Sequence, residues 1–332
     1  MARDYRIDSL KGLLIILVIT GHVITTLDNV NFINHGVMGL IYIFHMPLFI
    51  LISGYFSKSR EEQTPSAFWK STALLFVTLV IFHLIGCFRS YLSNPNARAI
   101  FDGFPFGEKM WIIFPFGELW YIISLIYWRI ILYYTPKALL KRPAIYLSIA
   151  LIVSILCGLT HLGMFLSIQR TMNFFLFFLL GYYFKHGCIS PKLWYNSKLQ
   201  AIVALVLLPI IFILFPRCGN FMNGADHYSL IDIPEKVMIL TCSISISLFI
   251  FNNMKDVKWL RPFGQDSLFY YLYHYLIIVL VIQPLVIRYE LPCTFPFIVC
   301  YTAFILIVLR LFSNVKFLRW LTHPKLPVKI KS

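Results

Sequence analysis

The sequence predicts an all-α membrane protein that crosses the bilayer about ten times and keeps both termini in the cytoplasm. Of its 332 residues, 59% are hydrophobic and only 13% are charged, and the mean hydropathy is +0.77. A chain with so few polar groups cannot cover a water-soluble particle of this size. Apolar runs of helical length recur along the whole chain, and the Lys and Arg residues alternate between the polar breaks that separate them.

The apolar runs define the expected transmembrane helices. A helix needs about 20 predominantly apolar residues to cross the hydrocarbon core. The hydropathy of the chain predicts ten such spans, at 10–27, 36–56, 71–88, 118–135, 144–160, 171–186, 199–215, 236–251, 267–287 and 294–312. An even number of spans places both termini on the same side of the membrane.

The basic residues give the orientation. Twenty of the 29 Lys and Arg residues fall in the two termini and in every second connection, whereas seven fall in the other connections. Because cytoplasmic segments carry the excess of Lys and Arg, we expect both termini in the cytoplasm and a multi-pass protein of the inner (cytoplasmic) membrane. The net charge is +15, but the twenty cations are spread over six segments expected in the cytoplasm, which favours contact with anionic membrane lipids over a nucleic-acid partner.

Residues 1–332 are expected to form one membrane domain with no appended soluble domain. The first span is long, carries internal polar groups and lacks a small-residue cleavage site, so we do not expect a cleaved signal peptide. The seven cysteines show no metal-ligand spacing, and no metal site is expected. Cys218 and Cys293 both lie in expected external connections, and whether they pair stays open.

Ionisable side chains inside the apolar runs are the first functional candidates, because such groups are costly in hydrocarbon unless they face a cavity or a partner. The stretch "RIDSLKGLLIILVITGH" at 6–22 carries Lys11 at one end and His22 eleven residues later. Eleven residues make about three helical turns, so both side chains lie on one face, roughly 16 Å apart along the axis. Asp8 is too far from His22 to orient it, and we expect it to pair with Lys11 instead.

Several segments together resemble the membrane-bound acyltransferase-3 family, which includes glycan O-acetyltransferases. The matching segments occur in the family's order and cover nearly the whole chain. They are Arg6-x-Asp8-x-Leu10-Lys11-Gly12 continuing to His22, "FHMPLFILISGYF" at 44–56, "ELWYIISL" at 118–125, "RTMNFFLFFLLGYYF" at 170–184 and "FGQDSLFYYLYHYL" at 263–276.

The resemblance implies that an acyl group passes from cytoplasmic acyl-CoA, acetyl-CoA above all, to a hydroxyl of an extracytoplasmic or lipid-linked glycan. Acyl-CoA is then a donor substrate, and no permanently bound cofactor is expected. Many members carry an Arg-x-x-Arg pair near the start of the third helix. This chain departs from that pattern with Lys58-Ser59-Arg60 and a lone Lys70.

The chemistry of acyl transfer assigns roles to the candidate residues. A base must take the proton of the acceptor hydroxyl, and imidazole titrates close to working pH, so His22 is the expected catalytic residue. The donor's phosphates need cations, which Lys11, Arg6 and Lys70 supply. Without the surrounding motif, however, Lys11 is explained by the excess of positive charge on the cytoplasmic side, and His22 by packing in the interior.

A second group of residues is expected to line the cavity or bind the acceptor. His45 precedes Pro47, which disturbs the backbone ladder and opens room for a polar pocket. Glu118 and Trp120 begin the fourth span from outside, where a sugar ring stacks on an indole and hydrogen-bonds a carboxylate. Arg170 begins the sixth span. Structural hydrogen bonding and an interfacial aromatic belt are the competing interpretations of these positions.

A transporter or flippase of a glycan or lipid intermediate is the alternative function, since it too needs many helices and buried polar groups. Such proteins commonly show internal symmetry, and none is visible here. The sequence leaves open the acyl group (acetyl or succinyl), the acceptor, the oligomeric state, and whether His22 acts as a base or carries the acyl group itself.

Overall fold

The computed structural model describes residues 3–27, 32–93, 119–160, 165–188, 196–214, 228–322 and 324. Within these ranges every regular element is a helix, and no strand occurs. The predicted all-α fold is therefore confirmed. Cys218 and Glu118 lie outside the described residues.

Four helices form the first half of the described chain: α1 (Tyr5–Thr26), α2 (Phe32–Phe56), α3 (Pro65–Ser93) and α4 (Trp120–Tyr134). Asp4 caps α1, because its carboxylate accepts the backbone N–H of Arg6 at 3.0 Å. Helix α3 starts with a proline, whose missing N–H costs nothing at that position. Helix α2 continues through Pro47.

The second half continues with a larger number of helices, several of them short. They are α5 (Lys137–Leu140), α6 (Pro143–Leu156), η4 (Cys157–Leu159), η5 (Phe165–Ser167), α7 (Ile168–Lys185), α9 (Ser197–Leu214), η6 (Leu230–Asp232), α11 (Ile233–Asn253), α12 (Arg261–Gln265), α13 (Ser267–Ile277), η7 (Ile278–Ile282), α14 (Gln283–Tyr289), α15 (Phe295–Phe312) and α16 (Lys316–Thr322). The segment η7 is a π-helical turn that joins α13 to α14 without a break.

Each predicted span overlaps a described helix; at 144–160 this is α6 followed by η4, and at 267–287 it is the continuous α13–η7–α14 segment. By length and composition, six of the described helical segments are suited to cross a membrane: Tyr5–Thr26, Gly36–Phe56, Pro65–Arg89, Leu230–Asn253, Ser267–Tyr289 and Phe295–Phe312. The chain is thus an integral membrane protein, while the count of ten spans and the cytoplasmic position of the termini stay predictions.

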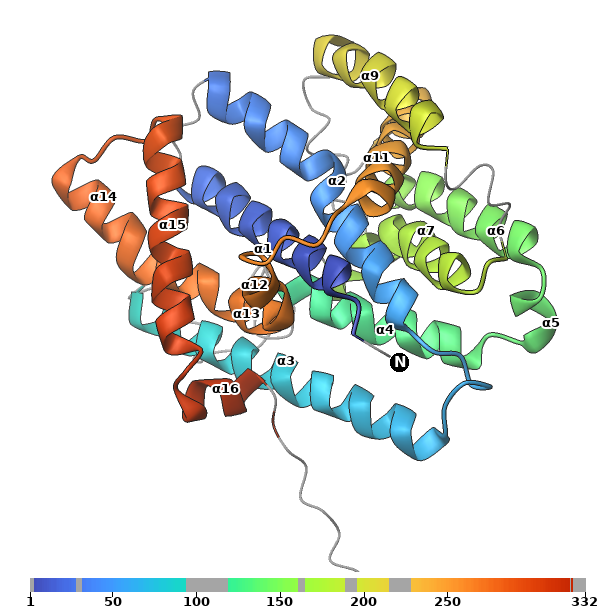
Figure 1. Ribbon diagram of the computed structural model, residues 1–332, viewed down its shortest axis with the longest axis horizontal. Coiled ribbons are helices and arrows are strands. Elements are labelled where there is room, and N and C mark those ends of the chain that lie inside the picture. The colour runs from blue at the N-terminus through green and yellow to red at the C-terminus, as the bar shows by residue number, and fades with distance from the viewer. Residues whose placement is uncertain are drawn as a thin grey trace, which may run out of the picture.

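Helix α1 lies at the centre of the molecule, between α2 on one side and α13 and α15 on the other (Figure 1). It also packs closely against α12. Because α1 is continuous from Tyr5 to Thr26, Lys11 and His22 belong to one unbroken helix, as the sequence predicted. Their neighbours come from helices that are far apart in the sequence.

Two pairs of glycines set the closest helix contacts. Gly54 of α2 and Gly181 of α7 lie where the two backbones touch, and a Cβ on either would overlap a carbonyl group of the other helix. Gly12 of α1 and Gly264 of α12 make the same kind of contact. All four glycines belong to the segments that resemble the acyltransferase-3 family, so part of that pattern specifies packing rather than chemistry.

Candidate functional site

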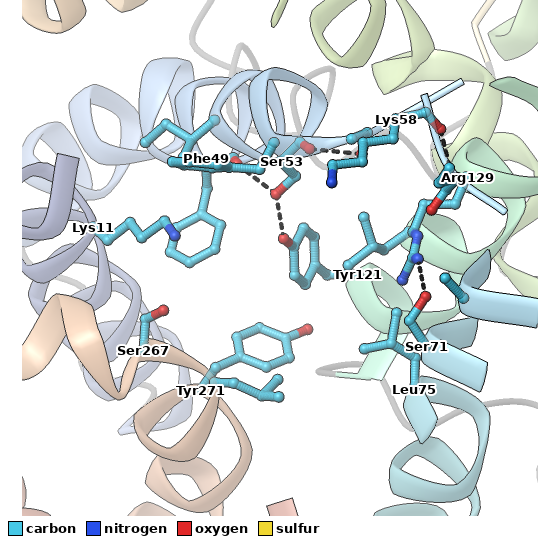
Figure 2. Close-up of a pocket in the computed structure, with 17 residues that line it drawn as sticks. Lys11, Phe49, Ser53, Lys58, Ser71, Leu75, Tyr121, Arg129, Ser267 and Tyr271 are labelled. Carbon is cyan, nitrogen blue, oxygen red and sulfur yellow. Dashed lines mark hydrogen bonds between the residues drawn. The ribbon is translucent and has the colours of Figure 1, made fainter. Parts of the chain in front are cut away.

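A cavity of about 550 Å³ opens among the ends of α1, α2, α3, α4 and α13. Its lining includes the basic residues Lys11, Lys58 and Arg129, together with several hydroxyl groups and aromatic rings, and we call it the cationic cavity. None of the described residues that line it is acidic. Figure 2 shows Lys11 and Arg129 on opposite sides, with Tyr121 between them.

The three basic side chains approach the cavity from different elements. Lys11 extends from α1, and its Nζ lies 4.6 Å from the ring centroid of Phe56. Lys58 follows the end of α2 in the connection to α3. Arg129 of α4 donates a hydrogen bond of 2.5 Å to the Ser71 hydroxyl of α3. The cavity therefore collects positive charge from separate parts of the chain.

These three cations differ from several basic groups nearby that are paired with a carboxylate. In the described part of the chain, none of them forms a salt bridge, whereas Arg3, Lys137 and Arg261 are each paired with a carboxylate. The hydrogen bond from Arg261 lowers the pKa of Asp256 below its ordinary value. These carboxylates form their salt bridges with residues outside the cavity, so the described lining of the cavity itself carries only positive charges.

Asp8 interacts electrostatically with Lys11, but within the described residues it forms its salt bridge with Arg3 and not with Lys11. Asp8 accepts a hydrogen bond of 2.6 Å from Arg3, which precedes α1 and folds back onto its first turn, and a longer one of 3.4 Å from Gln265. Because Arg3 lies outside the helix, the i,i+3 spacing did not reveal this competitor. As a result, Lys11 faces the cavity without a bound carboxylate.

Two further basic residues of the expected donor site lie outside the cationic cavity. Arg6 is exposed on the first turn of α1 and pairs with Asp4 at 3.2 Å. Lys70 is exposed on α3, next in the chain to Ser71, but does not itself line the cavity. The structure brings Lys11 to the cavity and leaves these two at the surface.

Three histidines gather deeper in the molecule, and we call His22, His45 and His274 the histidine cluster. The ring centroids of His22 and His274 are 5.1 Å apart, and that of Tyr275 lies 5.9 Å from His22. His45 interacts electrostatically with His22 and shares a hydrogen bond of 2.7 Å between its Nδ1 and the carbonyl of Ile41. His22 is partly buried, whereas the other two are buried.

The expected acceptor residues lie beside this cluster. The buried Arg170 of α7 lies over the indole ring of Trp120, 5.4 Å from its centroid, and interacts electrostatically with His22. Trp120 also stacks on Phe174 at 5.3 Å. The structure thus brings His22, His45, Trp120 and Arg170 into one neighbourhood.

An aromatic layer lies between the cationic cavity and the histidine cluster. It consists of Phe49, Tyr121 and Tyr271, which line the cavity. The ring of Tyr121 is 5.5 Å from Phe49 and 5.4 Å from Tyr271, and its hydroxyl makes a hydrogen bond of 2.6 Å with Ser53. The ring of Tyr271 also lies 6.2 Å from that of His274, so this residue contacts both the cavity and the histidine cluster.

Sequence reasoning missed the cavity positions of Lys58 and Arg129 and the closeness of His274 to His22. Arg129 inside the apolar run at 118–135 and His274 inside the run at 267–287 were visible signals, but their partners come from other helices. Among the residues that the structure describes, no three His, Cys, Asp or Glu side chains converge as a metal site.

The fold and the site define a class of protein: an integral membrane protein with a cationic cavity at one level and a histidine cluster at another. Residues 4–312 match the model of the acyltransferase-3 family, described as an acyltransferase domain. The chain belongs to this family, which confirms the resemblance found in the sequence.

One relative shows how far the similarity to individual proteins extends. The chain is similar to the nodulation protein NolL of Sinorhizobium fredii, with 38% identity over 88 residues. The match spans 26% of this chain and 24% of the relative's own length. The comparison with solved structures finds no match.

Proposed function

We propose that the protein is a membrane O-acyltransferase that moves an acyl group, acetyl above all, from acyl-CoA to a hydroxyl of an extracytoplasmic or lipid-linked glycan. Membership of the acyltransferase-3 family supports the reaction class. The observation that carries the choice of donor is the cationic cavity, whose three basic residues have no salt-bridge partner among the described residues.

The donor site follows from charge. CoA carries several phosphate charges, and basic side chains without carboxylate partners are suited to phosphate because charge-assisted hydrogen bonds are strong. A cavity of about 550 Å³ falls in the size range of small-molecule and cofactor sites. Lys11, Lys58 and Arg129 hold the phosphates, and the narrow pantetheine arm extends past Tyr121 and Tyr271 toward His22.

The chemistry is assigned to His22. Its imidazole takes the proton of the acceptor hydroxyl while the oxygen attacks the thioester carbonyl, so a C–O bond forms and the C–S bond breaks. The proton then passes from the imidazolium to the departing CoA sulfur, which leaves as the free thiol and returns His22 to its neutral form. A route in which His22 carries the acyl group itself needs the same position.

The acceptor approaches from the side of Trp120 and Arg170. An indole ring offers a flat apolar face to a sugar ring, and the guanidinium of Arg170 offers hydrogen-bond donors to its oxygens. His45 lines the same neighbourhood. This arrangement supports an acceptor that meets the donor at the level of His22.

The deciding experiment compares envelope glycans from cells with the wild-type protein, without it, and with His22→Ala. Mass spectrometry is expected to find an acyl mass, acetyl before succinyl, on a glycan only in the wild-type cells. A glycan that disappears from the outer face with no change of covalent mass would instead establish a transporter or flippase.

The orientation needs its own test. In intact cells, a tag in the connection at 137–142 and one after Ser332 are expected to be protected from external reagents, while a cysteine placed at Asn94 is expected to be labelled. Labelling of 137–142 from outside would place the cationic cavity on the wrong side of the membrane for a cytoplasmic donor.

A further inference from the structure

We infer that His274 is a positioning residue for the reaction, acting through His22. The inference rests on the proposed role of His22 as base. It starts from the side chain of His274, which is completely buried in α13 and has no assigned part in donor or acceptor binding.

The tautomer of His274 is fixed by its own helix. Its Nδ1 lies 2.8 Å from the carbonyl oxygen of Tyr271 and 3.1 Å from that of Tyr270. Carbonyl oxygens only accept hydrogen bonds, so Nδ1 carries the hydrogen and Nε2 is left as an acceptor. The two backbone contacts also hold the plane of the ring.

The free acceptor atom is the observation that points to a function. Within the described residues, Nε2 of His274 is buried and has no hydrogen-bond partner. Buried polar atoms without a partner are uncommon in folded proteins, because each loses its contact with water without replacement. This acceptor is therefore open to a hydrogen bond from a neighbouring group that can turn toward it.

His22 is the group that supplies that partner. Its ring centroid is 5.1 Å from that of His274, and α1 and α13 pack directly against each other. Neutral His22 carries a hydrogen on one nitrogen and takes the proton of the acceptor hydroxyl at the other, so the imidazolium has an N–H on each side. A rotation of the His22 ring that turns one N–H toward Nε2 of His274 forms this hydrogen bond, which stabilises the imidazolium without placing a second charge in the apolar interior.

A neutral imidazole as the hydrogen-bond acceptor for His22 differs from a carboxylate in the charge that it brings into the interior. A buried carboxylate would keep a permanent negative charge beside His22, and the desolvation of such a charge is costly in this interior. A neutral imidazole accepts the same hydrogen bond and carries no net charge in either step. The chain thus orients its base with a group that the apolar spans tolerate.

The test uses two substitutions that place the same amide group at different ends of the former imidazole ring. His274→Asn keeps a side-chain donor near the Nδ1 position and removes the Nε2 acceptor, whereas His274→Gln places its amide oxygen near the position of Nε2. Membrane vesicles that carry the native acceptor are supplied with radiolabelled acetyl-CoA. The maximal rate of incorporation and the KM for acetyl-CoA are measured for equal amounts of inserted protein.

We expect His274→Asn to lower the maximal rate about 10- to 100-fold with the KM for acetyl-CoA changed less than twofold, as for the loss of one hydrogen bond to a charged group. His274→Gln is expected to recover most of the rate. The double variant with His22→Ala should be no slower than His22→Ala alone, because the two residues act as a unit.

Three outcomes overturn the inference: a maximal rate of His274→Asn within twofold of wild type, an equal loss in the Asn and Gln variants, or a further loss in the double variant. A failure of the proposed function looks different. If His22→Ala itself stays active, then the base is misassigned; if it is inactive while His274→Asn is fully active, only the role of His274 is wrong.

Discussion

The cationic cavity and the histidine cluster differ in the electrostatic environment that they provide within one helix bundle. The cavity gathers Lys11, Lys58 and Arg129, keeps carboxylates out of its lining and contains partly buried or exposed charges. The cluster contains imidazoles in a buried setting, where a permanent charge is expensive. The first arrangement is suited to hold a polyanion, and the second to move a proton.

The aromatic layer between the two regions explains how a charged lining and a buried histidine cluster can occur in the same molecule. Phe49, Tyr121 and Tyr271 separate the charged lining from the histidines, and the hydroxyl of Tyr121 is fixed by Ser53. A low-dielectric layer of this kind limits water around the base and strengthens its interactions. If the proposed function is right, donor binding and acyl transfer depend on different residues, and substitutions should separate the two.

The largest expected effect is at the histidine cluster. His22→Ala should lower the rate of acyl transfer by at least about 10²- to 10⁴-fold, the loss typical of a general base, and leave acetyl-CoA binding unchanged. His22→Gln tests the same point with less change in volume. Transfer is measured by incorporation of radiolabelled acetyl, and binding by titration of the purified protein.

A folded His22 variant that acylates the native acceptor at nearly the wild-type rate would make this histidine a structural residue. Loss of acetyl-CoA binding together with transfer would also contradict the separation of the two regions. Membrane insertion of each variant is the control.

The next largest effect concerns the cavity. Arg129→Gln and Lys11→Ala should each weaken acetyl-CoA binding about 10- to 100-fold, because one charge-assisted contact contributes on the order of 1.5–3 kcal/mol. The maximal rate should change little, and Lys11→Arg should retain most binding. Lys141→Gln, an exposed cation outside the cavity, is the matched control. A fall in maximal rate at unchanged affinity would move Arg129 or Lys11 to the catalytic step.

Local periodicity predicted those parts of the site that lie on one helix. The spacing of Lys11 and His22 needed only the 3.6-residue repeat, and α1 contains both in a continuous helix. Contacts between helices were beyond that reasoning. The approach of His274 to His22 and of Arg129 to Ser71 depends on how α13 and α3 pack, which one sequence does not encode as a spacing.

The salt-bridge partner of Asp8 shows that spacing within one helix also fails to predict contacts with residues just outside that helix. The sequence offered Lys11 on the same helix face, whereas the structure uses Arg3 from the segment before the helix. That choice matters for function, because it leaves the charge of Lys11 available to the cavity.

A smaller effect is expected at the aromatic boundary. Tyr121→Phe removes one hydrogen bond with Ser53 and keeps the ring, so stability should fall by about 0.5–1.5 kcal/mol. Tyr146→Phe removes a comparable bond with Thr135, away from the cavity, and is the matched control. Thermal denaturation in detergent should show similar losses for both, and acyl transfer should slow only in Tyr121→Phe. Equal transfer rates in the two variants would leave the boundary with a packing role alone.

The smallest effect is expected for two basic residues outside the cavity, Arg6 and Lys70. Arg6 is exposed and paired with Asp4, and an exposed ion pair contributes at most about 1 kcal/mol. Lys70 is adjacent to Ser71, but consecutive helical residues point in directions about 100° apart, so its side chain does not follow Ser71 into the cavity. Arg6→Ala and Lys70→Ala should therefore change the KM for acetyl-CoA less than twofold at low ionic strength, where any remaining attraction is greatest. A tenfold rise in the KM of either variant would extend the donor site beyond the cationic cavity to the first turns of α1 and α3. Exposed cations around the cavity would then contribute to donor binding as the three cavity cations do.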